Sequence, residues 1–121
     1  LGWAVGDAYL AVGGRGAGLS FHSHPPAANL LLRGRKRWFA SLDRTDVGLP
    51  FDALRSVDGD GPSARGAPGP MGFGSMRGWL AGWYEEAGNG ERWRRHAWEC
   101  VQQEGDLLVL PGEALHGVVN G

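Results

Sequence analysis

The sequence predicts a small all-β domain, an antiparallel barrel or sandwich with one short helix packed against it. Up to position 42, short apolar or alternating segments are separated by glycine, as in strands and turns. The residues after position 96 repeat this pattern, and a single apolar stripe at helical spacing lies between the two regions. A chain of 121 residues can bury the core of one domain, so we expect residues 1–121 to form a single domain.

Four strands are expected in the first part of the chain. Each is a run rich in apolar or alternating residues, and glycine-rich turns at Gly13–Gly16 and Arg33–Arg35 separate them. This spacing is typical of antiparallel sheets. The expected strands are Ala8–Val12, Leu19–His24, Asn29–Leu32 and Lys36–Leu42.

Residues 43–75 have a different composition, dominated by Gly, Pro, Asp and Ser. Such a segment buries little apolar surface, and we expect a long flexible loop inserted into the domain. The helix is then expected over Met76–Ala87, where five apolar side chains recur at positions i, i+3, i+4, i+7 and i+8. These side chains are Met76, Trp79, Leu80, Trp83 and Tyr84.

Three strands are expected after the helix. Ala97–Gln102 is followed by a turn at Gly105–Asp106, then by Leu107–Leu110, expected to be buried, and by Leu115–Val119. The chain begins at Leu1 rather than at Met and stops at Gly121, directly after a strand-like segment. We therefore expect a fragment or an excised domain.

Composition excludes several classes of partner. Twelve basic and thirteen acidic residues give a formal charge of −1, so no global basic field recruits nucleic acid or an anionic membrane. No apolar run approaches the roughly 20 residues that span a bilayer. Cys100 is the one cysteine, which excludes an internal disulfide and a cysteine-based zinc site. Residues Arg92–Trp98 mix basic and aromatic side chains, but we interpret them as a connection from helix to strand.

Three histidines are the candidate metal ligands. Residues i and i+2 of a strand point to the same face, so His22 and His24 are expected to project together. His116 lies in a later strand and would complete a set of three ligands if the two strands are neighbours, with further coordination positions open. Imidazole suits Fe, Zn, Cu and Ni alike. The alternative is that two histidines spaced by two residues are surface or hydrogen-bonded strand residues.

The framework around these histidines resembles the cupin superfamily. Gly16 precedes His22 by five intervening residues, and Asn29 follows His24 after four, which is similar to the motif G-x5-H-x-H-x4-E with Asn29 in place of the glutamate. Gly105, Pro111, His116 and Asn120 have the spacing of the second motif, G-x5-P-x4-H-x3-N. The resemblance implies a double-stranded β-helix, or jelly-roll barrel, with His22, His24 and His116 as its metal ligands.

A narrower resemblance comes from Arg33–Phe39, which is similar to the G-x-K-R-W strand of JmjC-domain oxygenases. The resemblance extends over Tyr9–Asn120, apart from the loop at 43–75. It implies Fe(II) and 2-oxoglutarate as cofactors, a protein or peptide as substrate, and hydroxylation or demethylation as the reaction. It also implies that Lys36 binds the distal carboxylate of 2-oxoglutarate, with Asn29 as a second candidate cofactor-binding residue.

The sequence departs from the active JmjC pattern at His24, where active members carry Asp or Glu. Loss of that carboxylate removes an anionic ligand from the iron. Two alternatives therefore stay open beside the oxygenase. One is a catalytically inactive JmjC pseudo-enzyme that serves as an interaction module. The other is a three-histidine cupin metalloenzyme that does not use 2-oxoglutarate.

Overall fold

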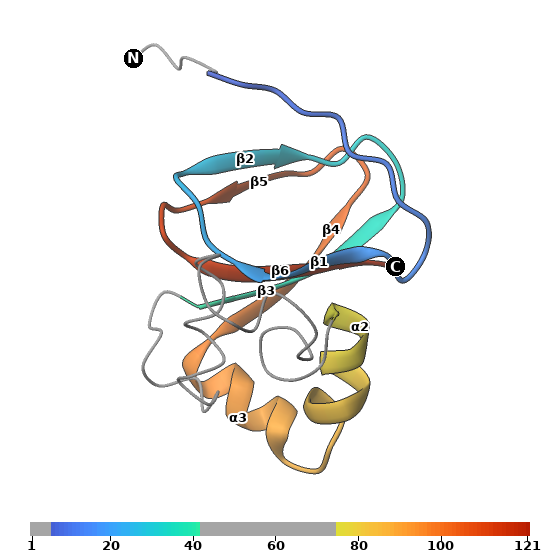
Figure 1. Cartoon of the computed structure of the whole chain (residues 1–121), viewed down its shortest axis with the longest axis vertical. Coiled ribbons are helices and arrows are strands. Elements are labelled where there is room, and N and C mark those ends of the chain that lie inside the picture. The colour runs from blue at the N-terminus through green and yellow to red at the C-terminus, as the bar shows by residue number, and fades with distance from the viewer. Residues whose placement is uncertain (1–5, 42–74) are drawn as a thin grey trace, which may run out of the picture.

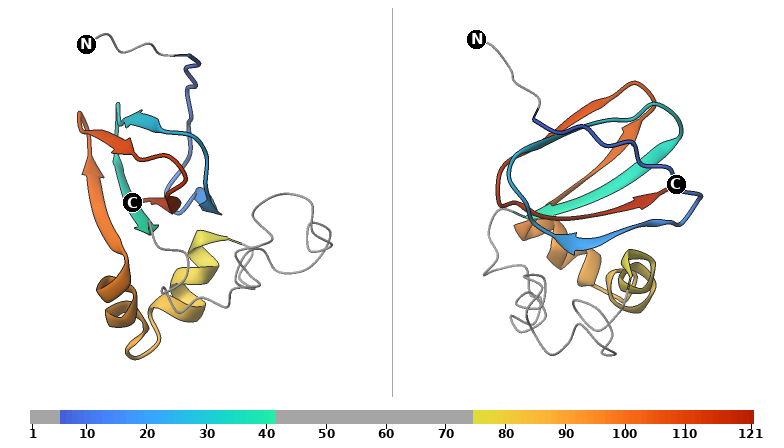
Figure 2. Two further views of the ribbon diagram at one scale, coloured as in Figure 1. Left: turned by 90° about the vertical axis from the view of Figure 1, so that its left-hand side faces the viewer. Right: turned by 45° about the horizontal axis from the view of Figure 1, so that its top comes forward.

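The computed structural model describes residues 6–41 and 75–121, which form three layers (Figure 1). A four-stranded antiparallel sheet lies in the middle, a two-stranded sheet covers one of its faces, and a helical layer covers the other (Figures 1 and 2). The described part of the chain is therefore mostly β-sheet, as the sequence predicts, with short helices on one side. Within these residues the two sheets do not close into a barrel.

The central sheet has the strand order β1-β6-β3-β4. Its strands are β1 (Gly18–His22), β3 (Arg35–Ser41), β4 (Trp98–Gln103) and β6 (Leu115–Asn120). The register pairs His22 with His116, and His116 with Ala40, so the segments that carry two of the candidate ligands are neighbours. The sequence does not reveal this pairing, because 92 residues separate β1 from β6 along the chain.

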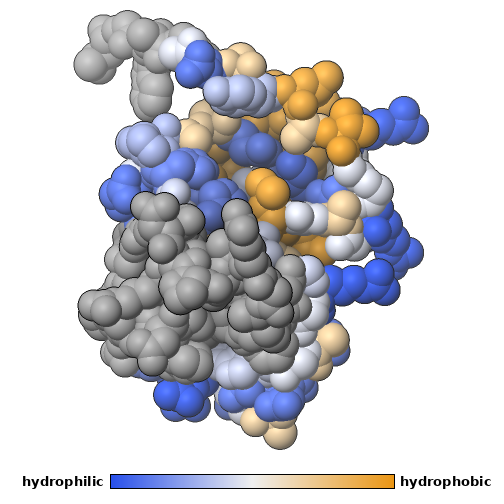
Figure 3. Space-filling view, in the orientation of Figure 1, coloured by the Kyte–Doolittle hydropathy of each residue, from blue (hydrophilic) through white to orange (hydrophobic). Residues whose placement is uncertain are grey.

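The second sheet pairs β2 (Ala27–Leu30) with β5 (Leu107–Leu110). Its outward side chains are apolar and exposed, and Figure 3 shows hydrophobic surface at the upper right of the molecule, toward the end of this sheet where β2 ends. The expectation that Leu107–Leu110 is a buried strand is therefore wrong in part. Leu110 is buried, but Leu107 and Val109 are 62% and 53% exposed, because a sheet covered on one face buries only alternate residues.

The helical layer begins at Ser75, whose Oγ accepts a hydrogen bond from the Gly78 N–H. The α-helix α2 (Met76–Trp79) continues directly into the π-helix η4 (Leu80–Tyr84). The predicted helix is thus confirmed, although it ends at Tyr84 rather than Ala87. Its apolar stripe packs on the central sheet in a cluster of buried residues: Phe21, Phe39, Met76, Trp79, Tyr84, Trp93, Leu115 and Val119.

A second helix, α3 (Asn89–His96), corrects the prediction of one helix and of a simple connection at Arg92–Trp98. This helix buries a single side chain, Trp93, which is fully inaccessible. The remaining positions are polar or charged, and Glu91 pairs with Arg95 across one turn at 3.8 Å. Trp93 is the one buried apolar side chain among the eight residues of α3, and a single side chain does not form an apolar stripe at helical spacing. The sequence pattern therefore does not reveal this helix.

Two further expectations have different outcomes: the strand at Ala8–Val12 is wrong, and the loop at 43–75 lies almost entirely outside the described residues. Ala8–Val12 is not a strand, and its side chains are exposed, with Tyr9 at 89% and Val12 at 93%. Alternation alone does not form a strand without a neighbouring strand to share its backbone hydrogen bonds. The loop expected at 43–75 lies outside the described residues except for Ser75, and Leu42 lies outside them as well.

The core between the two sheets is small and contains both apolar and polar groups. Trp38, Leu110 and Val118 are buried there, with Cys100 and Leu108 packed against them. Gln102 is 3% exposed and accepts a hydrogen bond from Trp38 Nε1 at 2.8 Å. Its own amide donates to the Asn29 carbonyl at 2.8 Å and to the Asp106 carbonyl at 3.0 Å, so this one side chain joins the two sheets.

Candidate metal centre

The histidine cluster lies on the face of the central sheet that is turned toward β2 and β5. In β6, alternate residues point to opposite faces, so His116 and Val118 face the second sheet while Leu115 and Val119 face the helices. His22 is the register partner of His116 and therefore shares its face. His116 is only 1% exposed, which places it at the base of the cluster.

The three rings approach one another closely. Ring centroids lie 4.3 Å apart for His22 and His116, 4.6 Å for His24 and His116, and 5.3 Å for His22 and His24. Their candidate ligand atoms all lie within 4.8 Å of one another. A metal with bonds of about 2.1 Å holds neighbouring nitrogens about 3 Å apart, so binding needs an inward movement of at most about 1 Å per ring. The geometric expectation that these three residues converge is met.

Hydrogen bonds fix which ring nitrogen is available. The Nδ1 of His22 lies 2.7 Å from the Ser20 carbonyl oxygen, and that of His24 lies 2.7 Å from the Pro25 carbonyl oxygen. A carbonyl oxygen only accepts, so each Nδ1 carries the proton and donates.

The Nδ1 of His116 donates in the same way, to the Ala114 carbonyl oxygen at 2.8 Å. In the neutral ring the lone pair of each histidine is therefore on Nε2, and all three Nε2 atoms are free to bind a metal. Histidine ligands in metalloproteins are usually held by such a bond from the other nitrogen.

Burial keeps His116 in the form that a metal requires. The pKa of His116 is lowered to about 4, chiefly by burial; the hydrogen bond to the Ala114 carbonyl opposes the change, and the charges of His22 and His24 add to it. The ring is therefore neutral at pH 7, and only neutral imidazole binds a metal ion. Within the described residues no acidic side chain belongs to the cluster, so the donor set consists of three imidazoles.

His24 reaches the cluster by a different route from the predicted one. The strand expected at Leu19–His24 ends at His22, and His24 lies in the segment that follows β1. The two-residue alternation of a strand therefore does not orient its ring. The hydrogen bond from its Nδ1 to the Pro25 carbonyl and its contacts with the rings of His22 and His116 orient the ring instead, which the sequence pattern does not show.

The structure places Lys36 on the same face as the histidines but at a distance along the sheet. Lys36 pairs with Asn120 and Ala40 pairs with His116, so four residues, about 13 Å of strand, separate the two positions. Trp38 lies between them, with Lys36 Nζ 5.9 Å from its ring centroid and the His116 ring 6.1 Å away. Lys36 thus faces the space between the sheets.

Asn29 also faces this space. It lies in β2, opposite Leu108 of β5, and its side-chain Oδ1 is buried without a hydrogen-bond partner. An orphaned acceptor of this kind is uncommon in a folded protein, because leaving it unpaired costs free energy. Sequence reasoning singled out Asn29 but missed Gln102, which binds its backbone, because one glutamine in a polar strand carries no distinguishing signal.

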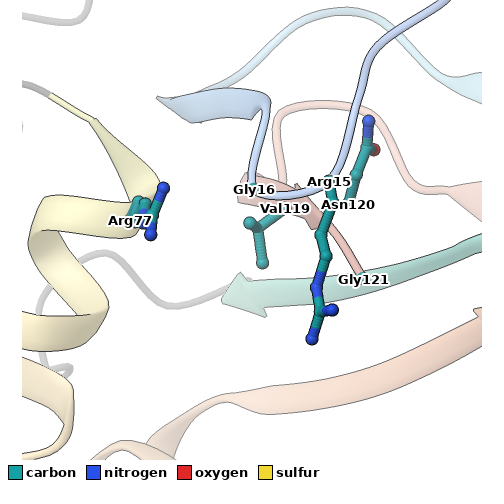
Figure 4. A pocket seen from close by; sticks show the side chains of 6 residues that line it. All are labelled: Arg15, Gly16, Arg77, Val119, Asn120 and Gly121. Carbon is teal, nitrogen blue, oxygen red and sulfur yellow. The ribbon is translucent and has the colours of Figure 1, made fainter.

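A separate hollow lies away from the histidines, at the opposite end of β6 (Figure 4). Figure 4 shows Arg77 of α2 on one side of it and Arg15 on the other. Its lining residues are Arg15, Gly16, Arg77, Val119, Asn120 and Gly121. None of them belongs to the histidine cluster, so the chemistry of that cluster does not depend on this hollow.

No family model, curated protein or solved structure matches the chain. In the described residues, no helix has the length and apolar character needed to cross a membrane.

Proposed function

We propose that His22, His24 and His116 bind a first-row transition metal, and that the chain is a JmjC-type, Fe(II)- and 2-oxoglutarate-dependent oxygenase acting on a protein or peptide. The observation that carries the metal site is the convergence of three rings whose Nδ1 atoms all donate to backbone carbonyls. Three independent donations to backbone leave three Nε2 atoms for one ion.

The order of the strands supports a jelly-roll barrel as the underlying fold. In a jelly roll, two sheets face each other and the chain passes repeatedly from one sheet to the other. Here β1 lies in the central sheet, β2 in the second, β3 and β4 in the central sheet, β5 in the second, and β6 in the central sheet again. In the proposed function this arrangement places the metal between the sheets, at one end.

The residues between the sheets support 2-oxoglutarate as the cosubstrate. Four residues of β3, about 13 Å, separate Lys36 from Ala40, the residue opposite His116. A lysine side chain and an extended dicarboxylate, placed end to end, would span this distance. The ammonium of Lys36 would pair with the distal carboxylate, and the unsatisfied Oδ1 of Asn29 lies in the same interior. When bound, iron and 2-oxoglutarate would supply the oxidation of a C–H bond by dioxygen; the three histidines would hold the metal, and Lys36 and Asn29 would position the cosubstrate.

A three-histidine enzyme that does not use 2-oxoglutarate is the second candidate. It is favoured by Trp38, which is 4% exposed and stands between Lys36 and His116. In this alternative the indole fills the space that the dicarboxylate would occupy. Metal binding is common to both candidates, and binding of 2-oxoglutarate separates them.

The first experiment measures metal binding. The chain is freed of metal with a chelator and titrated anaerobically with Fe(II), alongside His22→Ala, His116→Ala and a control, His96→Ala, which removes a histidine of α3. We expect one equivalent of Fe(II) to bind the parent and the control, and none to bind the two cluster variants. Equal affinity in all four proteins would show that these histidines are not ligands.

The second experiment measures turnover by release of CO2 from 2-oxoglutarate. A neutral imidazole at position 24 donates less charge to iron than a carboxylate, so we expect slow turnover by the parent and faster turnover by His24→Asp. Metal binding without turnover in both proteins would favour the inactive interaction module. Brisk turnover by the parent that His24→Asp destroys would identify the three-histidine set as the working catalyst.

A further inference from the structure

His24 differs from the other two histidines in how its backbone is held. His22 ends β1 and His116 lies within β6, so the ladder between these strands fixes both. His24 lies beyond the end of β1 and has no place in that ladder. Its ring orientation depends on the carbonyl of Pro25, so a shift of this short segment would move both the ring and its hydrogen bond. Some other contact must fix the segment.

Glu113 supplies that contact. Its backbone N–H donates to the His24 carbonyl at 3.0 Å, which links the segment after β1 to the segment before β6. Glu113 has a φ of 63° and is the one non-glycine residue with positive φ in the described part of the chain. A glutamate in the left-handed region is strained, and such strain persists where the surrounding structure requires it, often at functional sites.

A second contact between the same two segments supports the link. A Cβ added at Gly112 would lie 3.0 Å from Pro26 Cδ and 3.1 Å from Pro26 Cγ, so the Gly112 backbone already packs closely against that proline ring. The turn is closed by a hydrogen bond from the Ala114 N–H to the Pro111 carbonyl at 3.4 Å. The Ala114 carbonyl accepts from His116 Nδ1, so one turn contacts two ligand-bearing segments.

We propose that Glu113 is a positioning residue of the metal centre: its left-handed backbone directs an N–H at the His24 carbonyl and thereby orients the third ligand. The role belongs to the backbone, since the donor is the main-chain amide and the unusual feature is φ. The inference rests on the proposed metal site and is independent of whether 2-oxoglutarate is used.

The test compares Co(II) binding and the visible Co(II) spectrum of the full chain in four variants. Glu113→Gln changes the side chain and leaves the backbone preference alone, and Glu113→Gly favours positive φ. Glu113→Val penalises positive φ but keeps the N–H, whereas Glu113→Pro fixes φ near −65° and removes the donor. Glu85→Val is the matched control, because Glu85 is exposed, has a φ of −79° and lies in the helical layer.

We expect Glu113→Gln, Glu113→Gly and the control to bind Co(II) within about threefold of the parent. Glu113→Val should bind up to about tenfold more weakly, because a β-branched residue disfavours positive φ more than glutamate does, and Glu113→Pro more weakly still with an altered spectrum. Circular dichroism confirms that each variant is folded at the temperature of the titration, and Glu113→Val keeps the test decisive if Glu113→Pro does not fold.

Two outcomes would overturn the inference. Parent-like binding and spectrum in both Glu113→Val and Glu113→Pro would show that this backbone does not orient His24. Weakening by Glu113→Gln as large as that by Glu113→Val would assign the effect to the side chain. Failure of the proposed metal site is a different result, because the parent itself would then bind no Co(II).

Discussion

Burial of His116 predicts a specific dependence of stability on pH. The unfolded residue takes up a proton near pH 6.5, whereas the folded residue does so only at about pH 4. Between these values the unfolded state binds more protons, so the free energy of unfolding falls as the pH drops below 6.5 and levels off below 4. Each pKa unit corresponds to 1.36 kcal/mol, which gives a total loss of about 3 kcal/mol from this one side chain. Above pH 6.5 the contribution is constant.

The assay is urea unfolding of the metal-free chain at intervals from pH 4 to pH 7.5, with a chelator present. His116→Asn is the reference, because its amide does not titrate and its N–H still donates toward the Ala114 carbonyl. Titrating carboxylates contribute equally to both proteins and cancel in the comparison. We expect the parent to lose up to about 3 kcal/mol more than the variant over this range. Parallel curves would refute the argument that burial holds His116 neutral.

Three further substitutions test the cosubstrate site and the packing around the sheets. Lys36→Met keeps the length of the side chain and removes its charge, so calorimetry should show 2-oxoglutarate binding weakened by roughly 1.5–3 kcal/mol. Unchanged binding would favour the three-histidine enzyme that does not use 2-oxoglutarate. Gly117→Ala places a methyl group against Met76 Sδ, so urea unfolding should show a free energy of unfolding lower by roughly 1–3 kcal/mol. An unchanged midpoint would mean that α2 packs less closely on β6 than the structure shows. Gln102→Leu leaves Trp38 Nε1 buried without an acceptor, so the free energy of unfolding should fall by roughly 1–3 kcal/mol, and a neutral result would mean that water replaces the amide.

The sequence by itself determined the elements whose signal is local. The apolar stripe from Met76 to Tyr84 follows from helical spacing, and all six strands of the described residues lie within a few residues of the alternating or apolar runs that predict them. The candidate ligands His22, His24 and His116 were also identified from the sequence, by residue type, spacing and the resemblance to the two cupin motifs. Their convergence in the structure agrees with the two motif spacings.

Tertiary structure decided the features that depend on a distant partner. Ala8–Val12 has the alternation of a strand but no neighbour, so it remains exposed. The helix α3 exists because one residue, Trp93, packs into a core that other elements build. His24 lies outside β1, and a strained turn before β6 holds its backbone. A strand fixes which face a residue points to, but only contacts between segments far apart in the chain decide which side chains meet there.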